Sequence, residues 1–141
     1  MKQKSFAEFL LKKKLLTEEQ IRDIWAEVHL KKKEFHAILY EKQLLPEKTV
    51  AENYAEFLKL DFIDLNDYLI DPVTAKLIPE HIAKKHLVVA INKIGPTLIV
   101  AMADPLNIIA IDDIHQITGL TLRLNIAAPG AITKGIQASY G

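Results

Sequence analysis

Hydrophobic positions recur at an offset of 29 residues through the first half of the chain. The stretch "KKKLLTEEQI" at 12–21 returns as "EKQLLPEKTV" at 41–50, and the apolar positions agree while the polar ones drift. The paired positions are Phe6 with Phe35, Phe9 with Ile38, Leu10 with Leu39, Leu15 and Leu16 with Leu44 and Leu45, Ile21 with Val50, and Trp25 with Tyr54. Burial constrains apolar positions more than solvated ones, so the pattern predicts a duplicated packing unit.

Each copy of the repeat predicts two short helices. In copy one, Ser5 is expected to cap the first helix, and Thr17 the second, whose stripe of apolar residues includes Trp25. In copy two, Pro46 takes the place of Thr17, and proline suits the first turn of a helix. Trp25 and Tyr54 are expected to be largely buried. The lysine runs 12–14 and 31–33 are expected to end helices, where lysines interact favourably with the helix dipole and with solvent. The alternative is that these lysines form a binding site for an anion or a membrane surface.

The second half has a different pattern, which predicts the order β-α-β-β-α-β-α. Strands are expected at 60–65, 86–92, 97–103 and in "LTLRLNIA", with 86–92 and 97–103 forming an antiparallel hairpin across "KIGP". Helices are expected to start at Asp71 and at Pro79, and a closing helix follows in "PGAITKGIQASYG". A further helix is expected in 104–119, capped by Asp104 and opened by Pro105, with Leu106, Ile109, Ala110, Ile114 and Ile117 as its stripe and Gly119 as its stop.

The predicted fold class is therefore α+β. Duplicated short-helix pairs at 1–58, with repeats at 5–28 and 34–57, are expected to pack on a small mixed-sheet α/β domain at 59–141. Limited proteolysis is expected to separate the two units near residues 57–60.

Composition narrows the function. The 141 residues hold 18 basic and 18 acidic side chains, and this balance gives no electrostatic case for nucleic acid. The chain has no cysteine, which excludes disulfides and cysteine metal sites and is compatible with a reducing cytoplasm. The N-terminus is interpreted as a helix rather than a signal peptide, and no apolar stretch approaches the roughly 20 residues that span a bilayer.

Catalytic and metal motifs are weak. "GAITKGI" at 130–136 has phosphate-loop glycine spacing, but Ile136 stands where the mechanism needs lysine. Asp104 is better explained as a cap, and Asp112 with Asp113 as a solvated face, than as metal ligands. His81 and His86 are five residues apart and do not share a helix face. We therefore expect a non-enzymatic chain without a cofactor or metal.

The second half resembles the N-terminal domain of type II secretion and type IV pilus assembly ATPases. The resemblance rests on "LIPEHIAKKH", "VAMADPLN" and the flanking residues of 57–141. The repeat resembles the duplicated motif that precedes this domain in many such ATPases. The family's ATPase core, with its Walker motifs, is absent from these 141 residues. The resemblance implies a cytoplasmic regulatory domain, held near the inner membrane by the cytoplasmic part of a platform protein and touching the membrane only indirectly.

In one branch of the family, the resemblance implies binding of cyclic di-GMP. That site uses an arginine that opens each motif, glycines at its third and tenth positions, leucine-like residues and a closing glutamine. Here the opening arginines are replaced by Ser5 and Glu34, the third-position glycines by Ala7 and His36, the tenth-position glycines by Lys14 and Gln43, and the closing glutamines by Val28 and Phe57, while the leucine-like positions hold Leu10, Leu15, Leu39 and Leu44. Glu34 would repel a phosphate. We therefore expect protein docking as the main function and weak or absent cyclic di-GMP binding, with a cyclic di-GMP receptor as the alternative.

Overall fold

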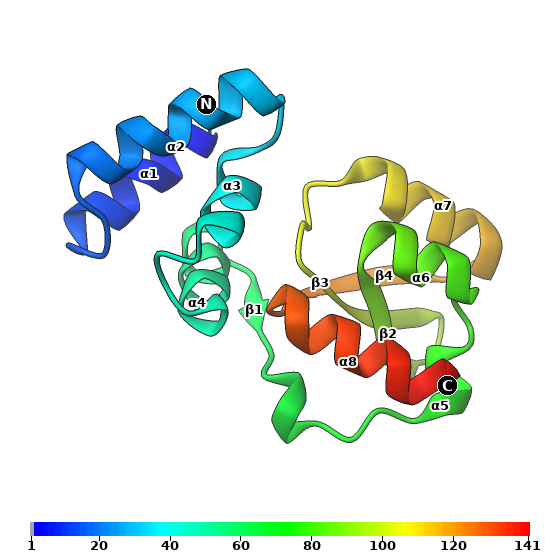
Figure 1. Cartoon of the computed structure of the whole chain (residues 1–141). Helices are drawn as coiled ribbons and strands as arrows, with labels where there is room; N and C mark the ends of the chain where they lie inside the picture. Colours follow the sequence, from blue (N-terminus) through cyan, green and yellow to red (C-terminus); the bar gives the residue numbers. More distant parts are fainter. Residues whose placement is uncertain (1) are drawn as a thin grey trace.

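The computed structural model describes the backbone of residues 2–141 and the side chains from residue 6 onward. Four helices make up the first half, at one side of the molecule in Figure 1. They are α1 (Lys2–Lys12), α2 (Glu18–Lys31), α3 (Phe35–Lys42) and α4 (Glu47–Leu58). Each copy of the repeat is thus one pair of helices, as the spacing of apolar residues predicted.

The starts of these helices follow the sequence only in part. Thr17 caps α2 as predicted: its Oγ1 accepts a hydrogen bond from the Gln20 N–H at 3.1 Å, and Gln20 Oε1 accepts from the Thr17 N–H at 2.9 Å. Pro46 occupies the N-cap of α4 rather than its first turn. The prediction that Ser5 caps α1 was wrong, because the helix already begins at Lys2 and Ser5 lies inside it.

The second half contains a four-stranded sheet with helices packed on it (Figure 1). Its elements are β1 (Asp61–Phe62), η1 (Leu65–Asp67), α5 (Pro72–Ala75), α6 (Glu80–His86), β2 (Val88–Ile94), β3 (Thr97–Met102), α7 (Ile108–Thr118), β4 (Thr121–Ile126) and α8 (Pro129–Tyr140). The strand order is β1-β4-β3-β2. β1 and β3 both run parallel to β4, and β2 runs antiparallel to β3. The mixed α/β class, the hairpin and the helix starts after Asp71 and at Pro79 are confirmed.

The strand expected at 86–92 is β2, which runs from Val88 to Ile94 because His86 still belongs to α6. Two other predicted boundaries in this half were further off. The strand expected at 60–65 is only two residues long, because Asp64 instead caps the short helix η1 by accepting from the Asn66 N–H at 3.0 Å. The helix expected from Asp104 begins at Ile108 and is capped by Asn107, whose Oδ1 accepts from the Ala110 N–H. Asp104 holds the preceding turn by accepting from the Leu106 N–H at 3.1 Å.

The apolar stripe predicted for α7 is only partly a core stripe. Ala110 and Ile114 are buried against the sheet, whereas Leu106, Ile109 and Ile117 are exposed. Gly119 ends the helix with a φ of 69°, as predicted for a left-handed C-cap. α7 therefore packs by a narrow edge and leaves large aliphatic side chains in solvent.

The core consists of two hydrophobic clusters. One lies among α1–α4, and the other lies between the sheet and helices α5–α8. They meet at the end of β4, where the buried Ile126 belongs to the helical cluster and the adjacent Ala127 to the sheet cluster. Polar contacts cross the same junction: Lys48 Nζ lies 3.3 Å from Asp64 Oδ2, and the Gly130 N–H donates to Glu47 Oε1 at 2.9 Å. Among residues 2–141, no helix has both the length and the apolar character needed to cross a membrane.

Candidate functional site

The candidate site is the pair of helix–turn–helix units in the repeat, because the cyclic di-GMP motif positions fall there. The tenth motif position lies in the turn of each unit, at Lys14 in copy one and Gln43 in copy two. Both have left-handed backbone, with φ of 62° and 53°. Glycine adopts this conformation without strain, whereas a residue with a Cβ does so at a cost. The turns thus keep a glycine-type geometry although the glycines are gone.

The third motif position lies in the core in both copies. Ala7 is 3% exposed and His36 is 4% exposed. The His36 ring stacks on Tyr54, with 4.8 Å between the ring centroids and 21° between their planes. Packing covers nearly all of both side chains, so neither leaves the open space that a motif glycine would offer to a ligand.

His36 also connects the two halves of the chain. Its Nε2 lies 3.8 Å from Asp104 Oδ2, and its Nδ1 has no hydrogen-bond partner among the described residues. Burial lowers the pKa of His36, against the opposing effect of the Asp104 and Glu34 carboxylates. The imidazole is therefore neutral near pH 7, and it offers no positive charge to a phosphate.

The opening positions carry no cation either. The side chain of Ser5 lies outside the described part of the structure. Glu34 is the exposed N-cap residue of α3, and its side chain makes no capping hydrogen bond. A carboxylate is favourable at a helix N-terminus, but it occupies the place where a phosphate would otherwise gain from the helix dipole.

The leucine-like positions divide into two types. Leu10 and Leu39 are fully buried in the helical cluster, whereas Leu15 and Leu44 are only partly buried. In copy two, a shallow hollow of about 360 Å³ lies beside Leu44 and is lined by residues 43–47. Leu15 and Leu44 are therefore the motif leucines that remain within reach of a partner.

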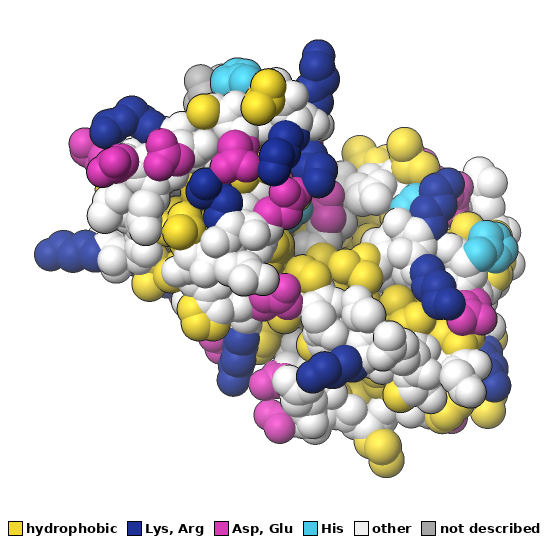
Figure 2. All heavy atoms as spheres, viewed as in Figure 1, with side chains coloured by type: hydrophobic (Ala, Val, Ile, Leu, Met, Phe, Trp, Pro, Cys, Tyr) yellow, Lys and Arg dark blue, Asp and Glu magenta, His cyan; other side chains and the backbone are white. Residues whose placement is uncertain are grey.

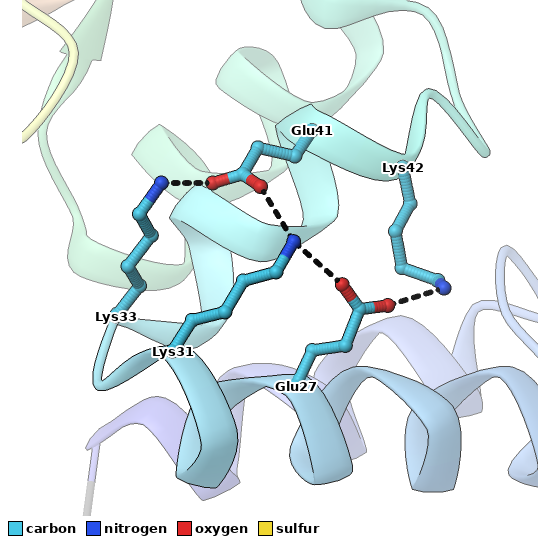
Figure 3. Close-up of polar contacts among 5 residues, drawn as sticks. All are labelled: Glu27, Lys31, Lys33, Glu41 and Lys42. Carbon is cyan, nitrogen blue, oxygen red and sulfur yellow. Dashed lines mark hydrogen bonds and ion pairs between the residues drawn. The ribbon is translucent and has the colours of Figure 1, made fainter.

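Lys31 and Lys33, which lie between the copies, are paired with glutamates of the same chain (Figure 3). Lys31 Nζ lies 3.0 Å from Glu27 Oε1 and 3.3 Å from Glu41 Oε1. Lys33 and Lys42 complete the chain of ion pairs, with 2.7 Å from Lys33 Nζ to Glu41 Oε2 and from Lys42 Nζ to Glu27 Oε2. Lys42 and Lys31 lower the pKa of Glu27, and Lys33 and Lys31 lower that of Glu41. The network joins α2 to α3, which favours a structural role for these lysines over an anion seat.

A cleft between the two halves was not predicted from the sequence. Its volume is about 300 Å³. Its walls include His36 and Tyr40 from α3, His86 from α6, Asp104 from the segment that follows β3, and Pro129 at the start of α8. Burial raises the pKa of the Tyr40 hydroxyl. The residues that line the cleft are far apart in the sequence, so no local sequence pattern predicts it. Among the described residues, no group of three or more His, Asp or Glu side chains could hold one metal ion.

The comparisons with known proteins agree with this architecture. The family model described as "MshEN domain" matches residues 58–141, and the chain belongs to this family. The resemblance to the N-terminal domains of type II secretion and type IV pilus assembly ATPases is thereby confirmed.

Individual relatives cover different parts of the chain. The type IV pilus assembly ATPase PilB of Myxococcus xanthus (strain DK1622) is 44% identical over 78 residues, which are 55% of this chain and 14% of that protein. The structure of MshE with cdg matches with a TM-score of 0.80 and 22% identity, over 96% of this chain and 98% of that one. The N-terminal domain of XpsE matches with a TM-score of 0.80 and 24% identity, over 96% and 94%. At these identities the two structural matches show the fold.

Proposed function

We propose that the chain is a non-catalytic docking and regulatory domain of a type II secretion or type IV pilus assembly ATPase. Its partner in this proposal is the cytoplasmic part of an inner-membrane platform protein, which would place the domain on the cytoplasmic side of that membrane. The family match and the 44% identity to a pilus assembly ATPase support this context. The neutral overall charge gives no support to nucleic acid as a partner.

The observation that carries the docking proposal is the state of the motif positions. The third-position residues Ala7 and His36 are buried in the core, and Glu34 places a carboxylate where the motif calls for arginine. A charge-assisted hydrogen bond to phosphate is worth about 1.5–3 kcal/mol. The loss of two arginines therefore costs about 3–6 kcal/mol, or about two to four decades of affinity. The repeat then serves mainly as packing.

Calorimetric titration with cyclic di-GMP tests this step. We expect weak or no binding by the unmodified chain. A variant with all the altered positions restored should bind more tightly, provided that circular dichroism shows it to be folded; its changes are Ser5→Arg, Ala7→Gly, Lys14→Gly, Glu34→Arg, His36→Gly and Gln43→Gly. A submicromolar Kd for the unmodified chain would make cyclic di-GMP reception the primary function.

A cyclic di-GMP receptor is the second candidate. It is favoured by the fold shared with the structure of MshE with cdg over 96% of this chain. The left-handed turns at Lys14 and Gln43 also keep the backbone that motif glycines would supply. Leu15 and Leu44 remain within reach of a ligand at these turns.

Docking itself is tested by biolayer interferometry with the purified cytoplasmic domain of a platform protein from the same organism. We expect saturable binding that cyclic di-GMP does not alter. The variant Leu30→Ser, which removes an exposed apolar residue from the copy-one helix α2, is the control for non-specific hydrophobic binding by the chain. No binding at concentrations where the chain is monomeric would contradict the docking proposal.

A further inference from the structure

One face of the sheet half carries large aliphatic side chains that nothing in the described chain covers. Leu106, Ile108, Ile109 and Ile117, together called the α7 ridge, are 41%, 69%, 68% and 49% exposed. Hydrophobic side chains gather over this part of the molecule in Figure 2. Single exposed apolar residues are common, but four from one helix and its entry turn mark an interaction surface.

The α7 ridge is interrupted by acidic side chains. Helix geometry places Asp112 beside Ile108 and Ile109, which lie four and three residues earlier. Asp113 lies on one row with Ile109 and Ile117, at spacings of four residues. Asp112 is exposed, while Asp113 Oδ2 lies 3.2 Å from His86 Nε2. Apolar and acidic side chains therefore alternate along this surface of α7.

Helix α6 contacts α7, but its residue Lys84 does not neutralise the acidic side chains of the α7 ridge. Lys84 on α6 is paired with Glu80, with 2.8 Å between Nζ and Oε2. A partner that covered the α7 ridge would also remove Asp112 from water. Burying an unpaired carboxylate is costly, so a stable partner must bring a cation to it.

We propose that the α7 ridge is the docking surface for a basic amphipathic segment of the partner protein. The segment would place apolar residues on Ile108, Ile109 and Ile117 and a lysine or arginine opposite Asp112. This inference rests on the proposed docking function and assigns it a surface. Cytoplasmic segments next to membrane spans are enriched in lysine and arginine, which matches a membrane-platform partner.

A second copy of this chain fits the surface less well. A two-fold dimer through α7 would place the same acidic helix on both sides of the interface. Asp112 and Asp113 would then face like charges, which opposes association. Charge complementarity therefore selects a basic partner over self-association.

Two labelled helical peptides test the proposal by fluorescence anisotropy. Both carry the same leucines on one face, and they differ in a central pair of arginines or of glutamates. We expect the arginine peptide to bind the chain about ten-fold more tightly than the glutamate peptide. Asp112→Lys should reverse this preference, and Ile109→Ser should weaken both peptides by about ten-fold. Asp23→Lys, on the exposed face of α2, controls for net charge, and Val73→Ser, on α5, controls for the loss of an exposed apolar residue.

The outcomes separate this inference from the proposed function. Equal binding of both peptides, or no effect of Asp112→Lys and Ile109→Ser, would overturn the assignment of the α7 ridge. Platform-domain binding that survives both variants would leave the docking function in place and move it to another surface. A dimer in analytical ultracentrifugation that Ile109→Ser dissolves would identify a second copy as the occupant and contradict the proposal.

Discussion

The two copies of the repeat share a frame of buried residues. Phe6 and Phe35 are both fully buried, and so are Leu10 and Leu39. The turns are equivalent too, since Lys14 and Gln43 both have left-handed backbone. The two copies therefore agree at the positions that packing and the turns require, although their polar positions differ.

The copies differ in how much they bury. Tyr54 in copy two is 1% exposed, as expected for a largely buried position, whereas its counterpart Trp25 is only partly buried. The cause is their placement: α4 contacts β1 and β4 of the sheet half, and α1 and α2 lie on the outer side (Figure 1). Equivalent sequence positions thus have unequal surroundings, and copy two has become the structural bridge.

The largest effect expected from this asymmetry is on core packing. Tyr54→Ala should lower the free energy of unfolding by about 3–5 kcal/mol, because it removes a buried ring that packs on Phe6 and His36. Trp25→Ala should cost less, about 1–3 kcal/mol, because part of its ring is already in water. Urea unfolding of both variants measures the difference. Equal losses would mean that the copies are equally buried in solution.

Tyr54→Phe is the matched control. It keeps the ring and its packing, so it should retain most of the stability that Tyr54→Ala loses. A loss as large as that of the alanine variant would assign the effect to the hydroxyl group rather than to packing.

The next effect concerns pH and separates His36 from its counterpart Ala7. Because burial lowers the pKa of His36 in the folded state, the unfolded chain binds a proton first as pH falls. Stability should be fully present above the unfolded pKa of about 6.5 and decline below it, by up to about 1.4 kcal/mol per pH unit, until the folded pKa is reached. His36→Ala should remove this slope.

Urea unfolding between about pH 5 and about pH 8 measures the slope. The exposed His81 on α6 provides the control, and His81→Ala should leave the slope unchanged. Asp104→Asn removes a carboxylate that raises the pKa of His36, so it should make the decline steeper or longer. An unchanged slope in His36→Ala would show that His36 is solvated.

A smaller gain is expected at the turns. Gln43→Gly and Lys14→Gly should each raise the free energy of unfolding by about 0.5–1 kcal/mol, because glycine adopts the left-handed backbone without strain. Glu52→Gly, at an exposed position within α4, should instead cost about 1 kcal/mol. A loss at Gln43 but a gain at Lys14 would show that the two turns are no longer equivalent.

Much of the fold was predictable because its signals are local. The apolar positions shared by the two copies predicted the four helices of the repeat. Thr17 predicted the start of α2, and the β-rich runs predicted the hairpin of β2 and β3. The errors at Asp104 and at 60–65 arose where a short polar side chain had two local hydrogen-bonding options. The contacts from His36 to Asp104 and from Glu47 to Gly130 join distant residues, so periodicity could not reveal them.

The division of the chain near residues 57–60 stays a prediction. The two hydrophobic clusters and the family match beginning at residue 58 support it. The shared Ile126 and the contact from Glu47 to Gly130 oppose full independence. Limited proteolysis with hydrogen exchange should show separate protection on the two sides of that segment, and one cooperative transition without cleavage there would contradict the division.

The smallest effect is expected at the ion pairs between the copies. Glu41 on α3 holds both Lys31 and Lys33, and all three side chains are well exposed to solvent. Exposed pairs are screened by salt, so Glu41→Gln should lower the urea midpoint slightly at low ionic strength and not at about 1 M salt. Glu52→Gln, on α4, is the control for removing an exposed acid and should show no such salt dependence. A loss of stability in Glu41→Gln that persists in high salt and is as large as that of Tyr54→Ala would contradict this prediction. It would mean that ion pairs, rather than the shared buried apolar residues, stabilise the contact between the two copies.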